Sequence, residues 1–559
     1  MTSIIQQLGF SQLQISSLIS LLSVTFCVNG QVAFGPVIES SECLSSPGND
    51  AFVDAIKSKD GGILVLGYLR ESVEGIIIPE GYLAPTVVIK KNADLENQWI
   101  QFIGGSDLGT SGHTILEDED GSIYCIGTSG ANTGDILGNN GVKDIFITKL
   151  TSEGDKLWTT VIGSTATDEV TSAGFTSTGD ILVTGYSFGD GGDIPYHYAS
   201  FTSTDVIYFS IDTSGNLNWL KVFGGTGVDQ PVFNTVLNND GNTLICIASS
   251  SADHDLVPYG LTDNWKFIMM EVDADGNTIY STGMDNDSTL EVFEGAMLLK
   301  EDSMLVFTTM SRYADLAVSK GIEDGAIVVF TPELELDRMY NYGGSNYDYL
   351  LRAIYEPTKQ VYYVLGSSYS IDQDLPGNYS GGIGDDFWLM SVDEEFNLLW
   401  SRNFGGANDS SSFGDAAWYV PGNMIYLSEK LHLFTSCYPT DNPPDFDLNC
   451  TPSTGIFTTT DGWRVTFDLL SMDIISDQGK NDIINIYPNP ANDIINISCI
   501  DCTNISAIRL TSVYGQDLLM KNSNCNEEFE IDVSGFSRGI YFIIVSVDAA
   551  NFIYPIILN

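Results

Sequence analysis

The chain has 559 residues, with 23 Lys and Arg against 74 Asp and Glu, so its formal net charge is −51. A surface this acidic repels nucleic-acid phosphates and anionic lipid headgroups, and we therefore expect no nucleic-acid partner. Hydrophobic residues make up 43% of the sequence, which is enough to bury a core and excludes a low-complexity tail.

An apolar run of eleven residues, 18–28, lies near the start of the sequence. It is too short to span a membrane as a helix, but it has the length of the apolar region of a signal peptide. We expect residues 1–30 to be a signal peptide. The first basic residue is Lys57, which a signal peptide does not favour, and the alternative is a buried N-terminal helix. No later stretch is long enough to span a membrane.

The dominant feature of the sequence is a repeat of about sixty residues. One aromatic residue marks each unit, at the end of an apolar stretch that precedes a glycine turn. These aromatic residues are Trp99, Trp158, Trp219, Tyr280, Tyr340 and Trp400. Their spacing of 59 to 61 residues over five steps indicates one structural unit repeated along the chain.

Each unit has the pattern of four short strands. Two apolar runs flank a polar turn such as DEDGS (118–122), and after a longer loop two more runs flank a second turn such as TSEGD (151–155). No helical period lies between them. Four strands per unit predict the blades of a propeller. The strand pairs begin near residues 55, 115, 173, 234, 295, 353 and 416, which predicts seven blades.

The seventh unit is incomplete. It has a hairpin segment (416–431) and a later strand (462–470), but no strand with the W-x-x-x-F-G-G pattern follows. Residues 31–40, QVAFGPVIES, are similar to that missing strand. We expect them to complete the last blade, because joining the two ends of the ring in one sheet leaves no open strand edge. The propeller would then span residues 31–470.

The recurring text F-G-G-[STA]-x-x-D, [IV]-x-G-x-S and D-x-[FW]-[IL] resembles the SBBP-type β-propeller repeats of secreted Bacteroidetes proteins. The resemblance covers about residues 50–470 and is strongest in the second, third and sixth units. It implies a propeller fold and a secreted protein, and it implies no particular activity.

A polar linker, residues 471–482, separates the repeats from residues 483–559, whose short alternating strands predict a small antiparallel β-sandwich. Three motifs stand in this last region: Tyr487-Pro488-Asn489-Pro490, Tyr514-Gly515-Gln516 and Gly539-Ile540-Tyr541-Phe542. Together they resemble the type A C-terminal sorting domain of the type IX secretion system. One departure is Pro555, which interrupts the final strand where such domains usually carry a Lys.

The predicted fold is therefore all-β: a seven-bladed β-propeller followed by a small antiparallel β-sandwich sorting domain. The sorting-domain resemblance implies that the type IX secretion machinery is a partner and that the protein is secreted or placed on the outer cell surface.

Residue types typical of catalytic sites are scarce. The chain has four His, without the spacing of a metal site, and it has no nucleophile elbow, P-loop or dinucleotide-binding motif. Carboxylates are abundant, but abundance alone does not single out the two that a glycosidase needs.

Two sets of Asp recur with the repeat. The first set closes the glycine turn between units, where we expect each carboxylate to accept backbone N–H groups: Asp168, Asp229, Asp348 and Asp409. The second set lies in the long loop of each unit: Asp135, Asp190, Asp193, Asp253, Asp255, Asp372 and Asp374. Carboxylates clustered on loops suit Ca²⁺, so these seven are calcium candidates, and the alternative is solvated turn residues. The last Asp of each group precedes an Ile or Leu, which would anchor the loop.

We expect a monomeric, non-enzymatic interaction or adhesion module with no cofactor other than calcium. Its ligand would be an extracellular protein or glycan, held by loops that carry Tyr196, Tyr198, Tyr259, Trp265, Tyr369 and Tyr379. Two alternatives stay open. One is an extracellular glycan hydrolase or lyase that uses carboxylates of the same loops, and the other is a purely structural role at the cell surface.

Overall fold

The computed structural model describes residues 36–44, 46, 49–73, 75–198, 202–259, 265–285, 291–300, 303–311, 319–375, 384–404, 423–437, 460–469, 484–487, 494–499, 505–512, 517–525, 529–536, 539–547 and 550–558. Their regular structure consists of β-strands and one short 3₁₀ helix, η1 (His254–Tyr259). Within these residues, no helix has both the length and the apolar character needed to cross a membrane. The all-β prediction is confirmed.

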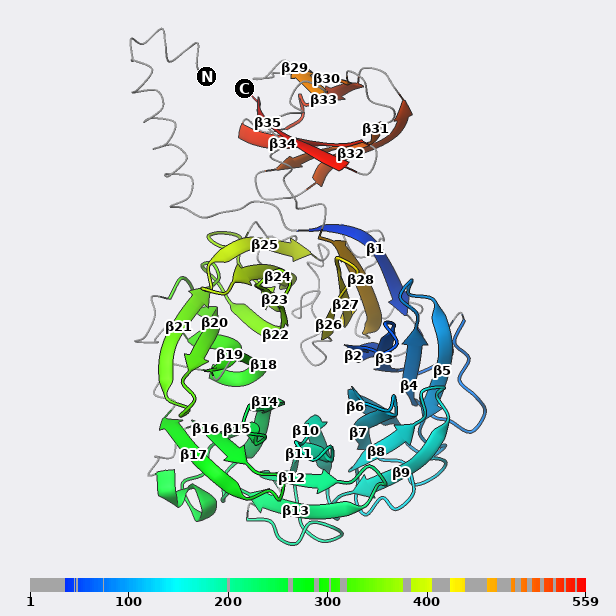
Figure 1. Ribbon diagram of the computed structural model, residues 1–559, viewed down its shortest axis with the longest axis vertical. Helices are drawn as coiled ribbons and strands as arrows, with labels where there is room; N and C mark the ends of the chain where they lie inside the picture. Colours follow the sequence, from blue (N-terminus) through cyan, green and yellow to red (C-terminus); the bar gives the residue numbers. More distant parts are fainter. Residues whose placement is uncertain are drawn as a thin grey trace.

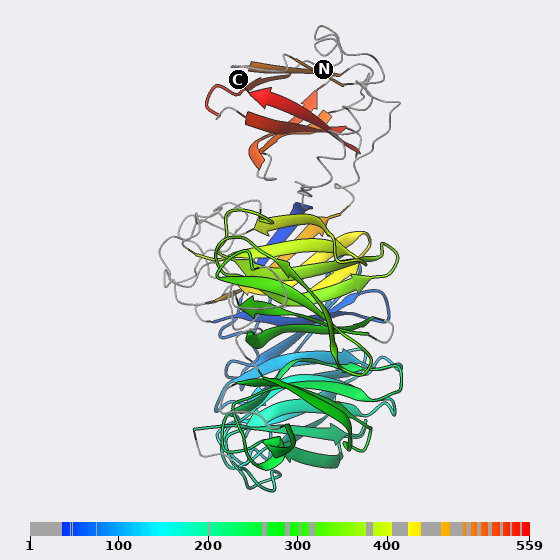
Figure 2. The same cartoon turned by 90° about the vertical axis from the view of Figure 1, so that its left-hand side faces the viewer.

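Strands β1 to β28 form a ring of seven four-stranded antiparallel sheets, a seven-bladed β-propeller (Figure 1). Figure 2 shows the same ring from the side. In each blade the strands are named a to d from the centre of the ring to its rim. The sequence-based prediction of seven blades is therefore confirmed.

The strand bounds repeat closely from blade to blade. Blade 1 contains β2 (Ala51–Lys57), β3 (Ile63–Tyr68), β4 (Thr86–Lys91) and β5 (Asn97–Ile103). Blade 2 contains β6 (Thr110–Glu117), β7 (Ile123–Ser129), β8 (Asp144–Leu150) and β9 (Lys156–Ile162). Blade 3 contains β10 (Asp168–Phe175), β11 (Ile181–Ser187), β12 (Asp205–Ile211) and β13 (Leu217–Phe223). Blade 4 contains β14 (Asp229–Leu237), β15 (Thr243–Ser249), β16 (Lys266–Val272) and β17 (Thr278–Asp285).

The other three blades follow the same plan. Blade 5 contains β18 (Glu291–Lys300), β19 (Ser303–Ser311), β20 (Glu323–Phe330) and β21 (Leu336–Tyr342). Blade 6 contains β22 (Asp348–Glu356), β23 (Val361–Ser368), β24 (Asp386–Asp393) and β25 (Leu398–Phe404). Blade 7 contains β26 (Asn423–Leu427), β27 (Lys430–Cys437), β28 (Asp461–Asp468) and, at its rim, β1 (Val37–Leu44).

The repeated aromatic residue contacts the next blade in blades 1 to 3. Trp99 in β5 lies against Gly154, in the turn after β8, and its indole N–H donates to a backbone carbonyl of that turn at 3.1 Å. A Cβ on Gly154, whose φ is +88°, would lie 2.8 Å from the indole ring. Trp219 contacts Gly276 of the following blade in the same way. The sixty-residue spacing of these aromatic residues therefore reflects a contact between neighbouring blades.

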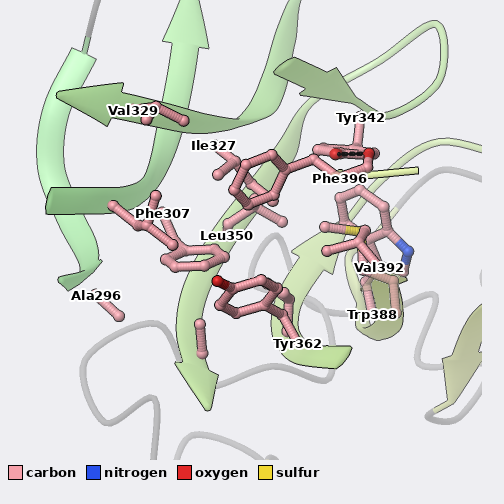
Figure 3. Close-up of a cluster of buried hydrophobic side chains, with 14 of the residues drawn as sticks. Ala296, Phe307, Ile327, Val329, Tyr342, Leu350, Tyr362, Trp388, Val392 and Phe396 are labelled. Carbon is pink, nitrogen blue, oxygen red and sulfur yellow. Dashed lines mark hydrogen bonds between the residues drawn. The ribbon is translucent and has the colours of Figure 1, made fainter. Parts of the chain in front are cut away.

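Hydrophobic clusters fill the spaces between blades, and one lies at each of the seven boundaries. Figure 3 shows the cluster between blades 5 and 6, where Phe307 and Ile327 meet Leu350 and Trp388. These four side chains are fully buried. Burial of one such side chain contributes about 2 kcal/mol to folding. Most of the hydrophobic core therefore lies between blades, and each blade depends on both of its neighbours.

The N-terminal strand completes the seventh blade. β1 pairs antiparallel with β28 along its whole length and forms the rim of that sheet (Figure 1). The strand occupies the predicted place, but it begins and ends later than the expected residues 31–40. The true counterpart of the glycine turns lies just after it, since Asp50 accepts the N–H of Ser46 as Asp168 accepts that of Ser164. Residues 31–35, which include the FG pair, lie outside the described residues.

The hairpin of blade 7 turns at Ser428 and Glu429, which both have positive φ values. Two such residues are typical of a two-residue hairpin turn. Only the second half of the predicted hairpin segment, residues 416–431, therefore falls in described strands.

The C-terminal region has two sheets. β29 (Ile484–Tyr487), β30 (Ile494–Cys499) and β33 (Phe529–Asp532) form one. β31 (Ile505–Ser512), β32 (Asp517–Cys525), β34 (Gly539–Val547) and β35 (Ala550–Leu558) form the other. Residues from both sheets share one hydrophobic cluster, which includes Ile495, Ile508 and Val545. Pro555 is in β35, an edge strand, where its missing N–H costs the sheet little.

Candidate functional site

The long loops and the blade-to-blade turns share one face of the ring. Because consecutive strands of a blade are antiparallel, the b–c loops and the d–a turns leave the strands at the same end. The short a–b and c–d turns leave at the opposite end. We call the first of these the loop face, and both recurring sets of Asp belong to it.

The first Asp set closes the blade-to-blade turns as predicted. Asp168, Asp229 and Asp348 each accept the backbone N–H four residues earlier, at 2.6 to 2.8 Å. All three side chains are fully buried. Asp409, the fourth member, lies outside the described residues.

A second buried carboxylate lies at the start of strand c in several blades, and sequence analysis did not single it out. Asp144, Asp205 and Asp324 are fully buried at this position. Burial raises the pKa of Asp144 to about 6, and the charge of Asp168 adds to the rise. Burial likewise raises the pKa of Asp348 to about 6, with a contribution from Asp324. Boundaries 2–3 and 5–6 thus each hold two buried carboxylates that repel each other.

The last Asp of each long loop binds the glycine turn of the preceding blade. Asp135, Asp193, Asp255 and Asp374 each accept the N–H of the first glycine of that turn, at 3.0 to 3.2 Å. The Ile or Leu that follows each of them is at most 1% exposed. These loops are therefore anchored as predicted, by one carboxylate and one buried apolar side chain each.

The remaining calcium candidates are also placed by the structure. Asp253 accepts the N–H and the hydroxyl of Thr226, at 2.8 and 2.9 Å, and Asp372 accepts the N–H of Ser345 at 2.7 Å. Asp190 is exposed. In the part of the chain that the structure describes, no three His, Cys, Asp or Glu side chains come together as metal ligands. Calcium binding at these loops stays a prediction.

Two of these candidates also form ion pairs. Lys156 Nζ lies 2.7 Å from Asp135, and Lys320 contacts Asp374. A lysine at these positions neutralises the carboxylate that a calcium ion would use, so Asp135 and Asp374 are the least suitable of the seven.

The innermost strands line a central cavity of about 400 Å³. β-Bulges in these strands turn polar side chains toward the neighbouring blade. Asp54, Ser172 and Asn234 each accept a backbone N–H of the next blade, at 2.7 to 2.9 Å. Asn423 of blade 7 donates to Asp54 at 2.7 Å. Sequence analysis did not identify these polar residues of the innermost strands. The available signal was a polar residue that recurs in an otherwise apolar strand at a spacing of about sixty residues or a multiple of it.

Among the described residues that line the cavity, three have ionisable side chains: Asp54, His113 and Arg352. Burial lowers the pKa of His113 to about 4, and the charge of Arg352 adds to this, so the imidazole is neutral at physiological pH. Burial raises the pKa of Asp54, although its hydrogen bonds oppose the rise. Arg352 donates to the carbonyls of Leu351 and Gly295. These polar groups are bonded mainly to the strands that form the cavity wall.

Large apolar side chains are exposed in the loops and turns of the loop face. The set with more than 40% exposure consists of Ile77, Leu83, Leu108, Leu137, Val142, Tyr196, Val257 and Ile371. Each belongs to a b–c loop or to a d–a turn. We call this set the exposed apolar residues of the loop face.

The predicted binding aromatics come together only in part. Tyr196 and Tyr198 lie with ring centroids 5.1 Å apart, and Tyr198 stacks on His254 at 4.3 Å. The other described members pack separately: Tyr259 against Ser281, Trp265 against the cluster between blades 4 and 5, and Tyr369 against Tyr347. Tyr379 lies outside the described residues.

A groove of about 530 Å³ lies on the loop face over blades 1 to 3. The ends of β3 and β7, the residues before β4 and β8, and the turn into β6 line it. The lining includes Tyr68, Arg70, Leu108, Ser111, Val142 and Lys143.

The sorting-domain motifs are described in part. Tyr487 lies in β29, and Gly539 and Tyr541 lie in β34. Tyr541 packs against Phe536 with ring centroids 6.3 Å apart. The other motif residues lie outside the described residues: Pro488, Asn489, Pro490, Tyr514 and Gly515.

Residues 485–559 match the family model described as a secretion system C-terminal sorting domain. The protein therefore carries a type IX sorting domain, which marks it for recognition by that machinery and for export to the cell surface or the medium. Cys43 in β1 is disulfide-bonded, which suits an oxidising location. A comparison with curated proteins gives no match.

Several solved structures are similar to the chain. One is a protein of Bacteroides vulgatus, with 12% identity over 77% of this chain and 97% of that one, at a TM-score of 0.35. Another is a mutant Trypanosoma rangeli sialidase with trans-sialidase activity, with 8% identity over 93% of this chain and 89% of that one, at a TM-score of 0.35. A third is a polysaccharide lyase, with 8% identity over 77% of this chain and 99% of that one, also at 0.35. Likenesses of this size carry no argument about activity.

Proposed function

We propose that the protein is an exported, non-enzymatic binding module whose loop face holds an extracellular glycan or protein. The observation that carries the proposal is the set of exposed apolar residues of the loop face. Apolar side chains that gather on one face of a soluble protein mark an interaction site more often than scattered ones do. Loops on a rigid scaffold are also where binding residues concentrate.

The bonding of the loop carboxylates supports binding rather than hydrolysis. A glycosidase needs two carboxyl groups that face one sugar, about 5 to 10 Å apart, with one pKa raised. The oxygens of Asp193, Asp253 and Asp255 instead accept N–H groups of the neighbouring turn. Carboxylates held in this way stabilise the loops that present the binding face.

A combined product and binding assay tests the proposal. The purified full chain is incubated with laminarin, xylan, alginate and polygalacturonate, and reducing ends and unsaturated products are measured beside saturable binding. We expect saturable binding to at least one of them and no new product. New reducing ends or unsaturated products would overturn the non-enzymatic proposal, and the absence of saturable binding to every polysaccharide would overturn a glycan as the ligand.

A pair of matched variants tests the location. Leu137 on the loop face is 66% exposed and Leu157 on the rim is 55% exposed, so neither substitution disturbs the core. We expect Leu137→Asp to weaken binding severalfold and Leu157→Asp to leave it unchanged. Equal effects of the two variants would show that the loop face is not the binding surface.

A further inference from the structure

The boundary between blades 1 and 2 departs from the repeat. At boundaries 2–3, 3–4 and 5–6 strand a begins with a buried Asp, namely Asp168, Asp229 or Asp348. At boundary 1–2 that position is Thr110, which pairs with Ser129 as Asp168 pairs with Ser187. At boundary 2–3 the residue that faces Asp168 is Asp144, at the start of strand c of blade 2. The equivalent residue at boundary 1–2 is Thr86, at the start of strand c of blade 1, and its hydroxyl donates to the carbonyl of Thr110 at 3.1 Å. This boundary therefore lacks both buried carboxylates.

The turn at this boundary is also longer. The segment from Gly104 to Thr110 has one residue more than the segment from Gly163 to Asp168. Leu108 lies in the longer turn and is 53% exposed. Residues of this turn line the groove defined above. The groove therefore lies at the boundary where the sequence departs from the repeat.

The groove has a different charge from the rest of the protein. Its ionisable lining side chains are Arg70, Lys143 and Glu169, whereas the whole chain carries a net charge of −51. Lys143 Nζ lies 3.0 Å from Glu169. Arg70 is exposed, and its guanidinium has no hydrogen bond or ion pair with any residue that the structure describes. Among the charged side chains that line the groove there is therefore one positive charge in excess, that of Arg70; outside the lining, Asp50 accepts the backbone N–H of Arg70 and Glu71 follows it in the sequence.

We propose that this groove binds a uronate-bearing segment of an acidic polysaccharide. The inference rests on the proposed function and names the ligand class of its loop face. A guanidinium binds a carboxylate through two parallel hydrogen bonds, and Arg70 supplies one to this groove, whereas Lys143 is already paired with Glu169. The exposed Ser111 supplies a hydroxyl group for a sugar hydroxyl. A volume of about 530 Å³ is within the range of small-ligand pockets, about 300 to 1,000 Å³.

The position of the groove favours a glycan over an acidic peptide. It crosses the ends of β3, β6 and β7 and does not follow a strand edge. It therefore offers no row of unpaired backbone groups to which a peptide could add as a strand. Side-chain hydrogen-bond donors beside the Lys143–Glu169 ion pair suit a carboxylated sugar better than they suit an acidic peptide.

The test compares an acidic oligosaccharide with its neutral ester. Calorimetry measures the binding of the full chain to oligogalacturonate, to the same oligomer as its methyl ester, and to an oligoglutamate of similar length. We expect saturable binding of the acid form alone. Equal binding of the ester would overturn the requirement for a carboxylate, and equal binding of oligoglutamate would overturn the assignment to a glycan.

Two variants and a control locate the site. We expect Arg70→Ala to weaken binding of the acid form about tenfold, as loss of one charged hydrogen bond predicts. Thr110→Asp returns the residue of the other boundaries and should also weaken it, with thermal unfolding checked for each variant. Lys59→Ala removes one positive charge from an a–b turn on the opposite face and should leave binding unchanged. Equal loss in Lys59→Ala would show a general charge effect and overturn the site.

The two proposals fail in different ways. If the chain binds another polysaccharide saturably and ignores oligogalacturonate, the uronate assignment is wrong and the binding module stands. If the chain releases unsaturated or reducing products from oligogalacturonate, the non-enzymatic proposal is wrong.

Discussion

The buried carboxylates between blades predict that the protein becomes more stable as the pH falls from 7 to 5. The native pKa values of Asp144 and Asp348 are raised from 3.8 to about 6, so the folded protein binds protons more readily than the unfolded chain between these values. The free energy of unfolding therefore rises as the pH falls through 6, and the gain is complete below about 4. Between pH 7 and pH 5 each of these carboxylates should contribute about 1 kcal/mol.

The variant Asp144→Asn isolates one of them. Its Oδ2 accepts the N–H of Asn140 at 2.6 Å, which an amide oxygen can still do, and its Oδ1 is buried without a hydrogen bond among the described residues. The amide NH₂ replaces the repelling charge near Asp168 by a donor. We expect the variant to raise the free energy of unfolding at pH 7 by about 2 kcal/mol and to reduce the gain toward pH 5.

Urea denaturation followed by intrinsic fluorescence, from pH 7.5 to 4.5, measures this effect. The measurements are made in about 0.5 M salt, because salt at this concentration screens the repulsion between exposed charges much more than the repulsion between buried charges. The control is Asp240→Asn, in an exposed turn, which removes the same charge from the surface. The reasoning would be refuted if Asp144→Asn lost stability at pH 7, or if Asp240→Asn gained as much.

Four further predictions follow from the loops and the two ends of the chain. Asp255→Ala frees the N–H of Gly224 and should lower the free energy of unfolding by about 1 kcal/mol, measured by urea denaturation; an unchanged midpoint would contradict this. If calcium binds the loop carboxylates, a chelator should lower the unfolding temperature, and an unchanged unfolding temperature would argue against calcium. Deletion of residues 483–559 should retain the protein inside the outer membrane, and immunoblots that still find it on the surface would argue against the sorting role. Deletion of residues 36–44 exposes the edge of β28 and should cause aggregation in size-exclusion chromatography, whereas a stable monomer would contradict the closing role of β1.

The fold could be predicted because its contacts repeat at a fixed distance in the sequence. A Trp that packs on a glycine of the next blade recurs near every sixty residues in the first three blades, as Trp99 on Gly154, Trp158 on Gly215 and Trp219 on Gly276. The sorting domain was predictable from its motifs. The place of β1 followed from the incomplete seventh unit, but its bounds did not, since pairing with β28 rather than local sequence fixes them.

The candidate site was less predictable. The loop Asp residues were identified, but the sequence could not show that Asp135, Asp193 and Asp255 bind the turn of the preceding blade, which lies about thirty residues earlier in the chain. The groove lies at a boundary that lacks the two buried Asp residues of other boundaries and has Thr86 and Thr110 in their place. Such a departure acquires meaning only once the structure shows which positions face each other across a boundary.

The pairing of β1 with β28 also imposes an order on biogenesis. β1, the first strand that the structure describes, cannot take its place until the segment that carries β28 has been made, so the ring stays open while the strands between them are synthesised. The sorting domain follows β28 in the sequence. The sorting domain is thus completed only after the described strands that close the ring have been synthesised.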